Sequence, residues 1–454
     1  MASVEALLAS GAEVTAWDRS AEPREALAGR GVTLADPLLI DLRGFDGVVV
    51  SPGVPLNTHP IAEKARAAGV PVIGDIELFA LARPDLPPHK VVGITGTNGK
   101  STTTALVHHI LKTAGVPTTM GGNIGLPILG QEPLPAGGVY VLELSSYQLD
   151  LTYSLDCDVA VLTNITPDHL DRYDGFEAYA ASKARLFEMS SGVRVIATDD
   201  DQTRRIALLL RHTGLDPASR SAGREEGSGT PAQGRGDVVE VDPASVVAGD
   251  QIFWPALQGP HNAQNALCAI AAAKAVGLAG NAIEQGLRTF PGLPHRMERI
   301  GEFGGVLFVN DSKATNPAST APALAAYPPN PHKRLHWIVG GLPKGDDLDE
   351  CAPHFGNVAC AYTIGEAGPL FSELLRPHMR VERAEMMCEA VRRAIAAAHP
   401  GDVVLLSPAC ASFDQFRDYE TRGEVFRKLV MGLAGGDEAA ARQAEAECVG
   451  RRVA

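Results

Sequence analysis

The sequence predicts an α/β protein of three domains whose sheets are mostly parallel. Segments with strand-like and helix-like patterns alternate along the chain in three successive blocks. Such alternation is typical of parallel sheets covered by helices, in which ligands bind at the carboxyl ends of the strands. The chain has 454 residues, a length that corresponds to about three domains.

The first block covers residues 1–76. Its apolar patterns predict a helix over residues 4–10, strands over 13–17 and 47–50, and a helix near 61–68. We expect these elements to form a small domain of their own.

The second block, residues 77–293, and the third block, residues 294–454, carry the longer strands. In the second block the apolar runs predict strands over 90–95, 139–144, 159–162 and 193–197, with helices over 101–114, 176–189 and 261–276. In the third block they predict strands over 306–309, 336–339, 361–364 and 403–406, with helices between them.

Composition and charge exclude several classes of partner. Hydrophobic residues make up 45% of the chain and charged residues 21%, as in ordinary globular proteins. No apolar run reaches the roughly 18 residues of a membrane helix. With 40 Lys and Arg against 54 Asp and Glu, the formal charge is −14, so we expect no nucleic-acid partner. The seven scattered cysteines include no CxxC pair, which favours a reducing cytoplasm over disulfides or structural zinc.

The stretch GITGTNGKST at residues 93–102 is the strongest functional signal. It places a glycine-rich turn between an apolar strand and a helix, an order that points backbone N–H groups at a polyphosphate. Lys100 can place a charge on the outer phosphates, and Ser101 can offer a hydroxyl to Mg²⁺. The glycines stand at 93, 96 and 99, so the turn is a variant of the usual phosphate loop. A glycine-rich turn without a ligand is the alternative. The predicted nucleotide contacts are Gly96, Thr97, Asn98, Gly99, Lys100, Ser101 and Thr102.

Three further side chains stand where such a site needs polar groups. Glu143 ends an apolar strand, where a Mg²⁺-linked acid belongs, although a helix-capping acid is the common alternative. His169 lies in a polar turn after the next strand, and we favour a metal or substrate contact over a structural role. Lys183 lies on an amphipathic helix, and spacing alone favours a solvated surface amine.

Two polar segments follow later in the chain. Asn262 and Asn265 stand in a first helical turn, where their amides can read a base or cap the helix. Spacing does not separate these roles. The segment 310–317, NDSKATNP, follows a strand and is too polar for a simple connector, since a helix cap uses only about two of its side chains.

Taken together, these motifs resemble those of the Mur ligase family, the ATP-dependent, amide-forming enzymes of peptidoglycan synthesis. Within that family the chain is most similar to the D-glutamate-adding members. The matching segments are GITGTNGKST (93–102), GGNIGLP (121–127), LELSSYQLD (142–150), NITPDHLDRY (164–173), SKARLF (182–187), GPHNAQNA (259–266), LPHRME (293–298), NDSKATNP (310–317) and SPACASFDQFRDYETRG (407–423).

The resemblance implies a domain plan and a reaction. Residues 1–76 would form a Rossmann-like domain that binds a UDP-sugar, residues 77–293 a P-loop ATPase-like domain, and residues 294–454 a Rossmann-like domain for the amino acid. The implied substrates are UDP-N-acetylmuramoyl-L-alanine, D-glutamate and ATP, joined through an acyl phosphate by a monomer. A folylpolyglutamate synthetase and a non-catalytic nucleotide-binding protein are the alternatives.

The resemblance also implies roles for particular residues. Lys100, Glu143, His169 and Lys183 would be catalytic. Ser101 and Glu143 would hold one Mg²⁺, and His169 with a carbamylated Lys183 would hold a second. The remaining implied contacts are with the muramoyl nucleotide (Asn123), the adenine nucleotide (Asn262, Asn265, Arg296, Asp311), D-glutamate (Lys313, Thr315, Lys344, Ser412, Phe413, Tyr419) and the uridine group (Asp18, Arg19, Ser51, Pro52, Gly53).

Two departures from the family pattern stand out. The family's first strand and its glycine-rich turn have no counterpart before Val4, so we expect either a start codon assigned too late or weak binding of the UDP-sugar. Leu342-Pro343 stands where many relatives carry an Asp nearby, which leaves the orientation of Lys344 open.

Overall fold

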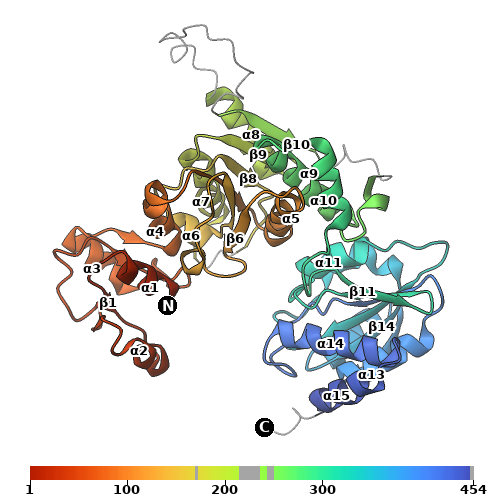
Figure 1. Ribbon diagram of the computed structural model, residues 1–454. Coiled ribbons are helices and arrows are strands. Elements are labelled where there is room, and N and C mark those ends of the chain that lie inside the picture. The colour runs from red at the N-terminus through yellow and green to blue at the C-terminus, as the bar shows by residue number, and fades with distance from the viewer. Residues whose placement is uncertain (169–171, 214–235, 243–249, 450–454) are drawn as a thin grey trace. The chain divides into compact units, whose positions relative to one another are not determined.

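The computed structural model describes residues 1–168, 172–213, 236–242 and 250–449. This part of the chain folds into two compact units (Figure 1). The first contains residues 1–246 and 264–288, and the second contains 247–263 and 289–454. His169 therefore lies outside the described residues.

The N-terminal part of the first unit contains two separate sheets of two parallel strands each. Its strands are β1 (Thr15–Ala16), β2 (Thr33–Leu34), β3 (Val48–Val49) and β4 (Val72–Ile73), and its helices are α1 (Ala2–Ala9), α2 (Ala21–Leu27), α3 (Pro60–Ala68) and α4 (Asp75–Ala82). Helix α3 has Pro60 in its first turn and ends at Gly69, which has a positive φ. The predicted elements are present, but each of the two predicted strands is only two residues long.

The rest of the first unit is built on a six-stranded, fully parallel sheet with the order β10-β9-β8-β5-β7-β6. Its strands are β5 (His89–Thr95), β6 (Thr118–Gly122), β7 (Gly138–Glu143), β8 (Val159–Leu162), β9 (Val193–Ala197) and β10 (Val238–Val241). The four predicted strands are confirmed to within one residue. The strands β6 and β10 were not predicted, because both are edge strands and neither is a continuous apolar run.

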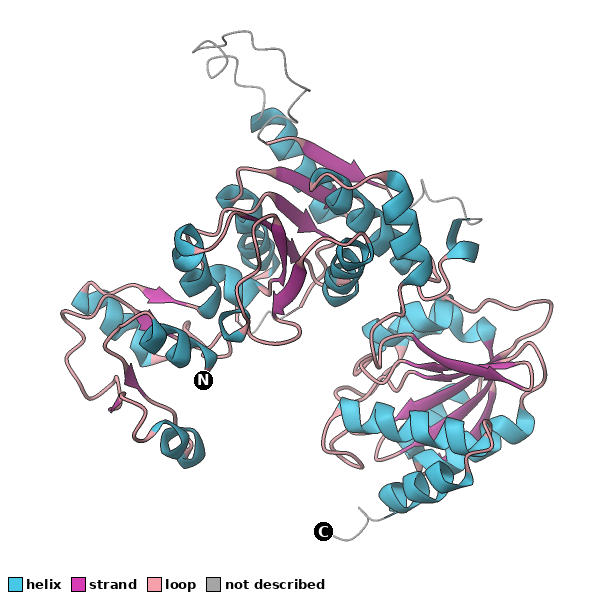
Figure 2. Cartoon of the chain, viewed as in Figure 1, coloured by secondary structure: helices cyan, strands magenta, loops and turns pink. Residues whose placement is uncertain are grey.

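Helices cover both faces of this sheet (Figure 2). They are α5 (Lys100–Thr113), α6 (Ser146–Asp150), α7 (Phe176–Met189), α8 (Asp201–Thr213), α9 (Pro260–Ala275) and α10 (Gly280–Thr289). One core cluster joins α4, α7 and α8 to the sheet, through side chains such as Phe79, Tyr179 and Ile206. The three helices predicted here are confirmed to within one residue.

The second unit contains a six-stranded sheet with the order β11-β12-β16-β13-β14-β15. Its strands are β11 (Glu298–Phe303), β12 (Val306–Asn310), β13 (Leu335–Gly340), β14 (Val358–Ile364), β15 (Arg380–Glu385) and β16 (Val403–Leu406). Only β11 runs antiparallel to its neighbour. The prediction of mostly parallel sheets is therefore confirmed.

Two hydrophobic clusters lie on the two faces of this sheet. One packs α13 (Met387–Ala397), α14 (Tyr419–Leu433) and α15 (Glu438–Val449) on it, and the other packs α11 (Pro317–Ala325) and α12 (Gly368–Leu375). The loops that carry most of the predicted functional residues follow the carboxyl ends of the strands in these two sheets. Within the described residues, no helix combines the length and the apolar character needed to cross a membrane.

Candidate active site

The glycine-rich turn joins β5 to α5, as predicted, and requires glycine at two positions. Gly99 precedes α5 with φ +81°, and a Cβ atom there would collide with the side-chain amide of Asn265. Gly96 has φ +148°, and its Cβ atom would collide with the hydroxyl of Thr163. Any other residue would be strained and crowded at both positions. Glycine therefore allows the backbone to approach the neighbouring segments closely.

Asn164 holds this turn in place. The N–H of Asn98 donates to Asn164 Oδ1 at 2.8 Å, and Asn164 Nδ2 donates to the carbonyl oxygen of Asn98 at 3.0 Å. The N–H of Thr97 donates to the carbonyl oxygen of Asn164 at 2.9 Å. The sequence interpretation missed this role. Its signal was an amide side chain just after β8, the strand that pairs with β5.

Two lysines meet at one carbonyl oxygen in the turn. Lys100 Nζ lies 2.9 Å from Gly96 O and 2.7 Å from Thr97 O. Lys183 Nζ donates to Gly96 O at 2.7 Å and lies 4.6 Å from the centroid of the Tyr179 ring. Burial, reinforced by the charge of Lys100, lowers the pKa of Lys183 to about 6. The Tyr179 hydroxyl lies 3.1 Å from Thr97 Oγ1, a contact that the sequence did not predict.

Lys183 is not the solvated amine that its spacing favoured. Its side chain is 2% exposed, and it lies on the face of α7 that packs against the sheet. The amphipathic pattern identified the helix correctly. The prediction of a surface amine was wrong because the hydrophobic pattern of a helix assigns polar residues to its solvent-facing side. A polar side chain on the buried side cannot be recognised from that pattern.

Glu143 is the buried carboxylate at the carboxyl end of β7. It is 1% exposed, and its Oε1 accepts a hydrogen bond from Asn123 Nδ2 at 2.9 Å. Its Oε2 is also buried and has no hydrogen-bond partner within the described residues. A buried carboxylate oxygen without a donor is costly unless a cation compensates it. Since Mg²⁺ prefers oxygen ligands, Glu143 fits such an ion. The predicted second ligand, Ser101, stands at the start of α5, the helix that follows β5, and β5 pairs with β7.

In the second unit, the segment around Arg296 packs on the turn after β12. The N–H of Met297 donates to Asp311 Oδ1 at 3.1 Å, and Ser407 Oγ donates to Asp311 Oδ2 at 2.8 Å. Burial raises the pKa of Asp311 to about 7. Both neighbours of Arg296, His295 and Met297, have positive φ angles, near 60° and 47°. The structure therefore places the Arg296 segment against Asp311, close enough for the charge of Arg296 to act on that carboxyl, and it does so with a strained backbone.

The predicted D-glutamate residues come from three loops at the carboxyl edge of the same sheet. Lys313 Nζ lies 3.2 Å from the Tyr419 hydroxyl, and Lys344 Nζ lies 3.2 Å from Thr315 Oγ1. These pairs join the loop after β12 to the loops after β16 and β13. The position of Lys344, which the Leu342-Pro343 departure left open, is thus beside Thr315. Ser412 is 2% exposed, whereas Phe413 is 69% exposed.

The predicted uridine contacts lie in two separate parts of the N-terminal region. Asp18 and Arg19 follow β1, and their carbonyl oxygens accept hydrogen bonds from Arg24 Nη1 at 2.7 Å and 3.0 Å. The segment 51–53 follows β3, which belongs to the other two-stranded sheet. Arg172 Nη1 donates to the carbonyl oxygen of Gly53 at 3.4 Å. In the part of the chain that the structure describes, no shared sheet joins the two halves of the predicted uridine site.

Helix α9 carries the two predicted amides. Asn265 Oδ1 accepts a hydrogen bond from Thr103 Oγ1 at 3.3 Å in the first unit. Asn262 Nδ2 donates to the carbonyl oxygen of Gln258 at 3.1 Å in the second unit. Neighbouring Gln264 donates to the carbonyl oxygen of Thr163 at 2.6 Å, which further supports the segment next to the glycine-rich turn.

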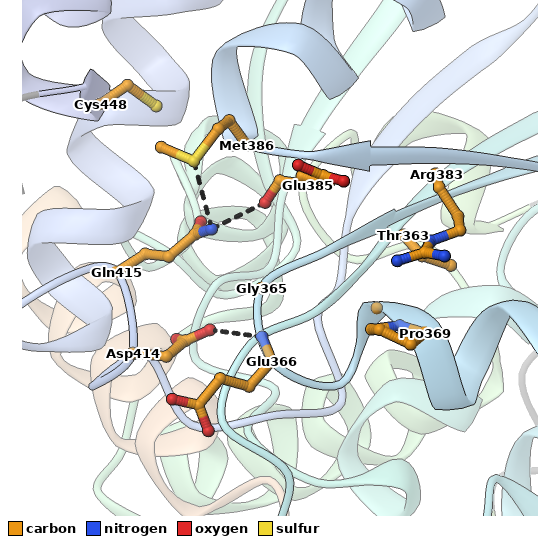
Figure 3. Close-up of a pocket in the computed structure, with 11 residues that line it drawn as sticks. Thr363, Gly365, Glu366, Pro369, Arg383, Glu385, Met386, Asp414, Gln415 and Cys448 are labelled. Atoms are coloured by element: carbon orange, nitrogen blue, oxygen red, sulfur yellow. Dashed lines mark hydrogen bonds between the residues drawn. The ribbon is translucent and has the colours of Figure 1, made fainter. Parts of the chain in front are cut away.

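A pocket in the second unit lies beside the predicted amino-acid loops but contains none of the predicted residues (Figure 3). Asp414 Oδ2 accepts from the N–H of Glu366 at 3.0 Å, and Gln415 Nε2 donates to the carbonyl oxygen of Glu385 at 2.7 Å. The two loop residues therefore tie the segment that follows Ser412 to the ends of β14 and β15. The pocket is lined by Thr363, Gly365, Glu366, Gly368, Pro369, Arg383, Glu385, Met386, Asp414, Gln415 and Cys448.

A glycine-lined turn at the end of a parallel sheet, with lysines and a buried carboxylate around it, is the arrangement of an enzyme that acts on phosphate groups. Comparison with known families defines the class more narrowly. Residues 94–273 match the Mur ligase middle domain, and residues 295–410 match the domain described as "Mur ligase, glutamate ligase domain". The chain belongs to the Mur ligase family.

Several similar proteins carry the name UDP-N-acetylmuramoylalanine--D-glutamate ligase. The protein of that name from Novosphingobium aromaticivorans is 63% identical over 97% of this chain and 94% of its own length. The one from Sphingopyxis alaskensis is 61% identical over 95% of each chain. The one from Caulobacter vibrioides (strain NA1000 / CB15N) is 46% identical over 97% of this chain and 95% of its own length.

Solved structures agree on the fold. UDP-N-acetylmuramate-alanine ligase MurC from Thermotoga maritima is 16% identical, with a TM-score of 0.55 over 95% of this chain and 96% of that chain. FolC of E. coli, solved with DHPP and ADP, is 20% identical, with a TM-score of 0.53 over 81% of this chain and 94% of that chain. At these identities the likeness concerns the fold alone.

Proposed function

We propose that this chain is an ATP-dependent ligase that joins D-glutamate to UDP-N-acetylmuramoyl-L-alanine, a cytoplasmic step in peptidoglycan precursor synthesis. The observation that carries the proposal is 63% identity, over 97% of this chain, to a protein named for that ligation. We further propose that it acts as a monomer, with UDP-sugar, ATP and amino-acid domains at residues 1–76, 77–293 and 294–454.

The first half of the proposed reaction activates a carboxylate. A carboxylate oxygen of the muramoyl-alanine nucleotide attacks the γ-phosphorus of ATP, the bond to the bridging oxygen breaks, and ADP leaves. Both reactants are anions, so positive groups must hold them together. Lys100 has a flexible stem next to the glycine-rich turn, and in the proposed complex its ammonium group moves from the turn's carbonyl oxygens to the phosphates.

The family's two magnesium ions have matching residues in this chain. Ser101 and Glu143 would hold the first, consistent with the buried carboxylate oxygen of Glu143 that lacks a partner within the described residues. His169 and Lys183 would hold the second. When bound, Mg²⁺ supplies positive charge that reduces the repulsion between the carboxylate and the triphosphate.

Lys183 is proposed to react with CO₂ before it serves as a metal ligand. A neutral amine attacks CO₂, an N–C bond forms, and one proton is released, so the side chain becomes an anionic carbamate. The buried position of Lys183 next to Lys100 suits this change, because an anionic carbamate there would attract the ammonium group of Lys100, whereas a protonated Lys183 is repelled by it.

The second half of the proposed reaction forms the amide. The amine of D-glutamate attacks the acyl carbon, and phosphate leaves from the tetrahedral intermediate. The two carboxylates of D-glutamate require cationic and hydroxyl donors. We propose that these donors, and the residues that line the pocket, are Lys313, Thr315, Lys344, Ser412, Phe413 and Tyr419. Asn262, Asn265, Arg296 and Asp311 would bind the adenine nucleotide, Asn123 the muramoyl group, and Asp18, Arg19, Ser51, Pro52 and Gly53 the uridine group.

A coupled ADP-release assay tests this function. The full chain is given ATP, Mg²⁺ and UDP-N-acetylmuramoyl-L-alanine, and each amino acid is then added in turn. We expect sustained ADP release, over many turnovers, and a new amide only with D-glutamate, and no amide with L-glutamate. Turnover with a folate and L-glutamate would instead identify a folylpolyglutamate synthetase. Nucleotide binding without ADP release under any of these conditions would identify a non-catalytic protein.

A further inference from the structure

Arg422, in the first turn of α14, has a fully buried guanidinium group. Its side chain is 1% exposed. Burying a guanidinium group is costly unless its N–H groups find acceptors. In this chain the acceptors come from two loops that are more than ninety residues apart in sequence. The buried guanidinium group therefore connects these two loops.

Four hydrogen bonds define that connection. Towards the turn after β12, Arg422 Nε donates to Ser312 Oγ at 3.0 Å and Nη2 donates to Ser312 O at 2.8 Å. Towards the loop after β16, Nη2 donates to Cys410 O at 3.0 Å and Nη1 donates to Ala411 O at 3.1 Å. All four acceptors are neutral. The guanidinium fork is thus used to fix geometry between two backbone segments and not to neutralise a carboxylate.

Ser312 completes the link. Besides accepting from Arg422, its hydroxyl donates to the carbonyl oxygen of Tyr419 at 2.8 Å. Lys313 follows it directly in sequence, and Ser412 directly follows Ala411. The residues assigned to D-glutamate therefore flank the atoms that Arg422 holds, on both sides of the link.

We propose that Arg422 and Ser312 form a positioning latch that sets the separation of the two loops of the amino-acid pocket. The inference rests on the proposed function, because it concerns the D-glutamate site of that reaction. Arg422 does not touch the substrate. It acts by fixing where Lys313 on one loop and Ser412 and Tyr419 on the other are placed, which is a requirement of tight binding of a small, doubly charged amino acid.

Two variants test the latch in the full chain. Arg422→Lys keeps the charge, but its single ammonium group cannot make the four hydrogen bonds of the guanidinium group. Ser312→Ala removes only one hydroxyl, so it remains informative if the arginine variant fails to fold. Ser312→Ala loses the two hydrogen bonds of that hydroxyl, with Arg422 and with Tyr419, so we expect the KM for D-glutamate to rise at least about tenfold. The KM for ATP and the yield of acyl phosphate without D-glutamate should stay within about twofold of wild type.

A matched control separates positioning from general packing. Ser372→Ala removes another buried hydroxyl, on α12, and Ser372 Oγ has no hydrogen-bond partner within the described residues. We expect this control to leave every kinetic constant unchanged. Equal losses in both half-reactions, or an unchanged KM for D-glutamate in Ser312→Ala, would overturn the latch.

Amide hydrogen exchange provides a readout that does not depend on turnover. In Ser312→Ala, but not in Ser372→Ala, residues 313–316 and 411–416 should exchange faster together. If the wild-type chain forms no amide with any amino acid, the proposed function fails, and this exchange experiment still decides whether the two loops are coupled. Unchanged exchange in both segments would show that they are not.

Discussion

Lys100 and Lys183 donate hydrogen bonds to the same acceptor, the carbonyl oxygen of Gly96, at 2.9 Å and 2.7 Å. They reach it from different elements, since Lys100 begins α5 and Lys183 lies in the middle of α7. Two ammonium ions this close repel each other, and the buried one gives up its proton more easily. The glycine-rich turn therefore holds two lysines, and the amine of one of them, Lys183, is readily made neutral.

The first prediction concerns Lys183→Met, which should abolish ligation while it stabilises the fold. If Lys183 holds the second metal ion, as proposed, its loss should reduce ADP release by about 100-fold or more. Burial lowers the pKa of Lys183 from its usual 10.5 to about 6. Between these two pH values Lys183 carries a proton in the unfolded state but not in the folded state. The free energy of unfolding of the wild type therefore rises with pH in this range. Near neutral pH the Lys183→Met variant should be more stable than the wild type by about 1–3 kcal/mol, and this difference should shrink as the pH rises.

Urea unfolding at several pH values and ADP-release assays provide the two measurements. The matched control is Lys112→Met on α5, an exposed lysine whose loss should change neither stability nor activity. A Lys183→Met variant that keeps full activity would rule out any role for this amine in holding a metal ion.

The second prediction concerns the metal ion that Glu143 fits. Glu143→Gln keeps the shape of the side chain and an acceptor for Asn123 Nδ2, but it removes the negative charge. We expect ADP release to fall by about 100-fold and the Mg²⁺ concentration for half-maximal activity to rise. Removing the metal from wild type with EDTA should stop the reaction, and added Mg²⁺ should restore it.

Glu177→Gln, an exposed substitution on α7, is the control for that experiment and should behave as wild type. The assignment fails if Glu143→Gln shows the same Mg²⁺ dependence as wild type.

Much of the fold could be predicted because its central strands are continuous apolar runs. The strand β8 was predicted with its observed bounds, and β5 and β7 to within one residue. Edge strands were missed because they are solvated on one side. The sequence RVERAE of β15 alternates charges with apolar residues, and TTMGG of β6 is rich in Thr and Gly. Their pairing depends on a neighbouring strand that the local pattern does not contain.

The site could be predicted in part for a related reason. Glu143 ends a strand, and Lys100 begins the helix after the turn that follows one, so their positions themselves indicate a ligand. Asn164 and Arg422 act through contacts with residues that are 66 and 110 positions away in sequence. The burial of Lys183 depends on which face of α7 meets the sheet. These features follow from the order of the strands in the sheet, which local patterns do not determine.

The third prediction concerns Asn164→Ala, which should loosen the glycine-rich turn. The substitution removes two side-chain hydrogen bonds to Asn98, at 2.8 Å and 3.0 Å. Each is worth about 1 kcal/mol, so the KM for ATP should rise at least about tenfold, with a smaller effect on the KM for D-glutamate. Asn357→Ala, which removes an amide contact to Leu324 O in the second unit, is the control. An unchanged KM for ATP in Asn164→Ala would show that the turn keeps its shape unaided.

The fourth prediction concerns Asp311→Asn and its pH dependence. Burial raises the pKa of Asp311 from its usual 3.8 to about 7, so between these values the folded state holds a proton that the unfolded state has lost. Wild-type stability therefore falls as pH rises through this range, and the loss is complete above pH 7. Asparagine cannot ionise and still provides an oxygen for the N–H of Met297 and an amide for Ser407. In urea unfolding, the variant should gain about 1–3 kcal/mol over wild type at pH 8 and much less at pH 5. An equal difference at both pH values would mean that Asp311 is already ionised in the folded protein at pH 5.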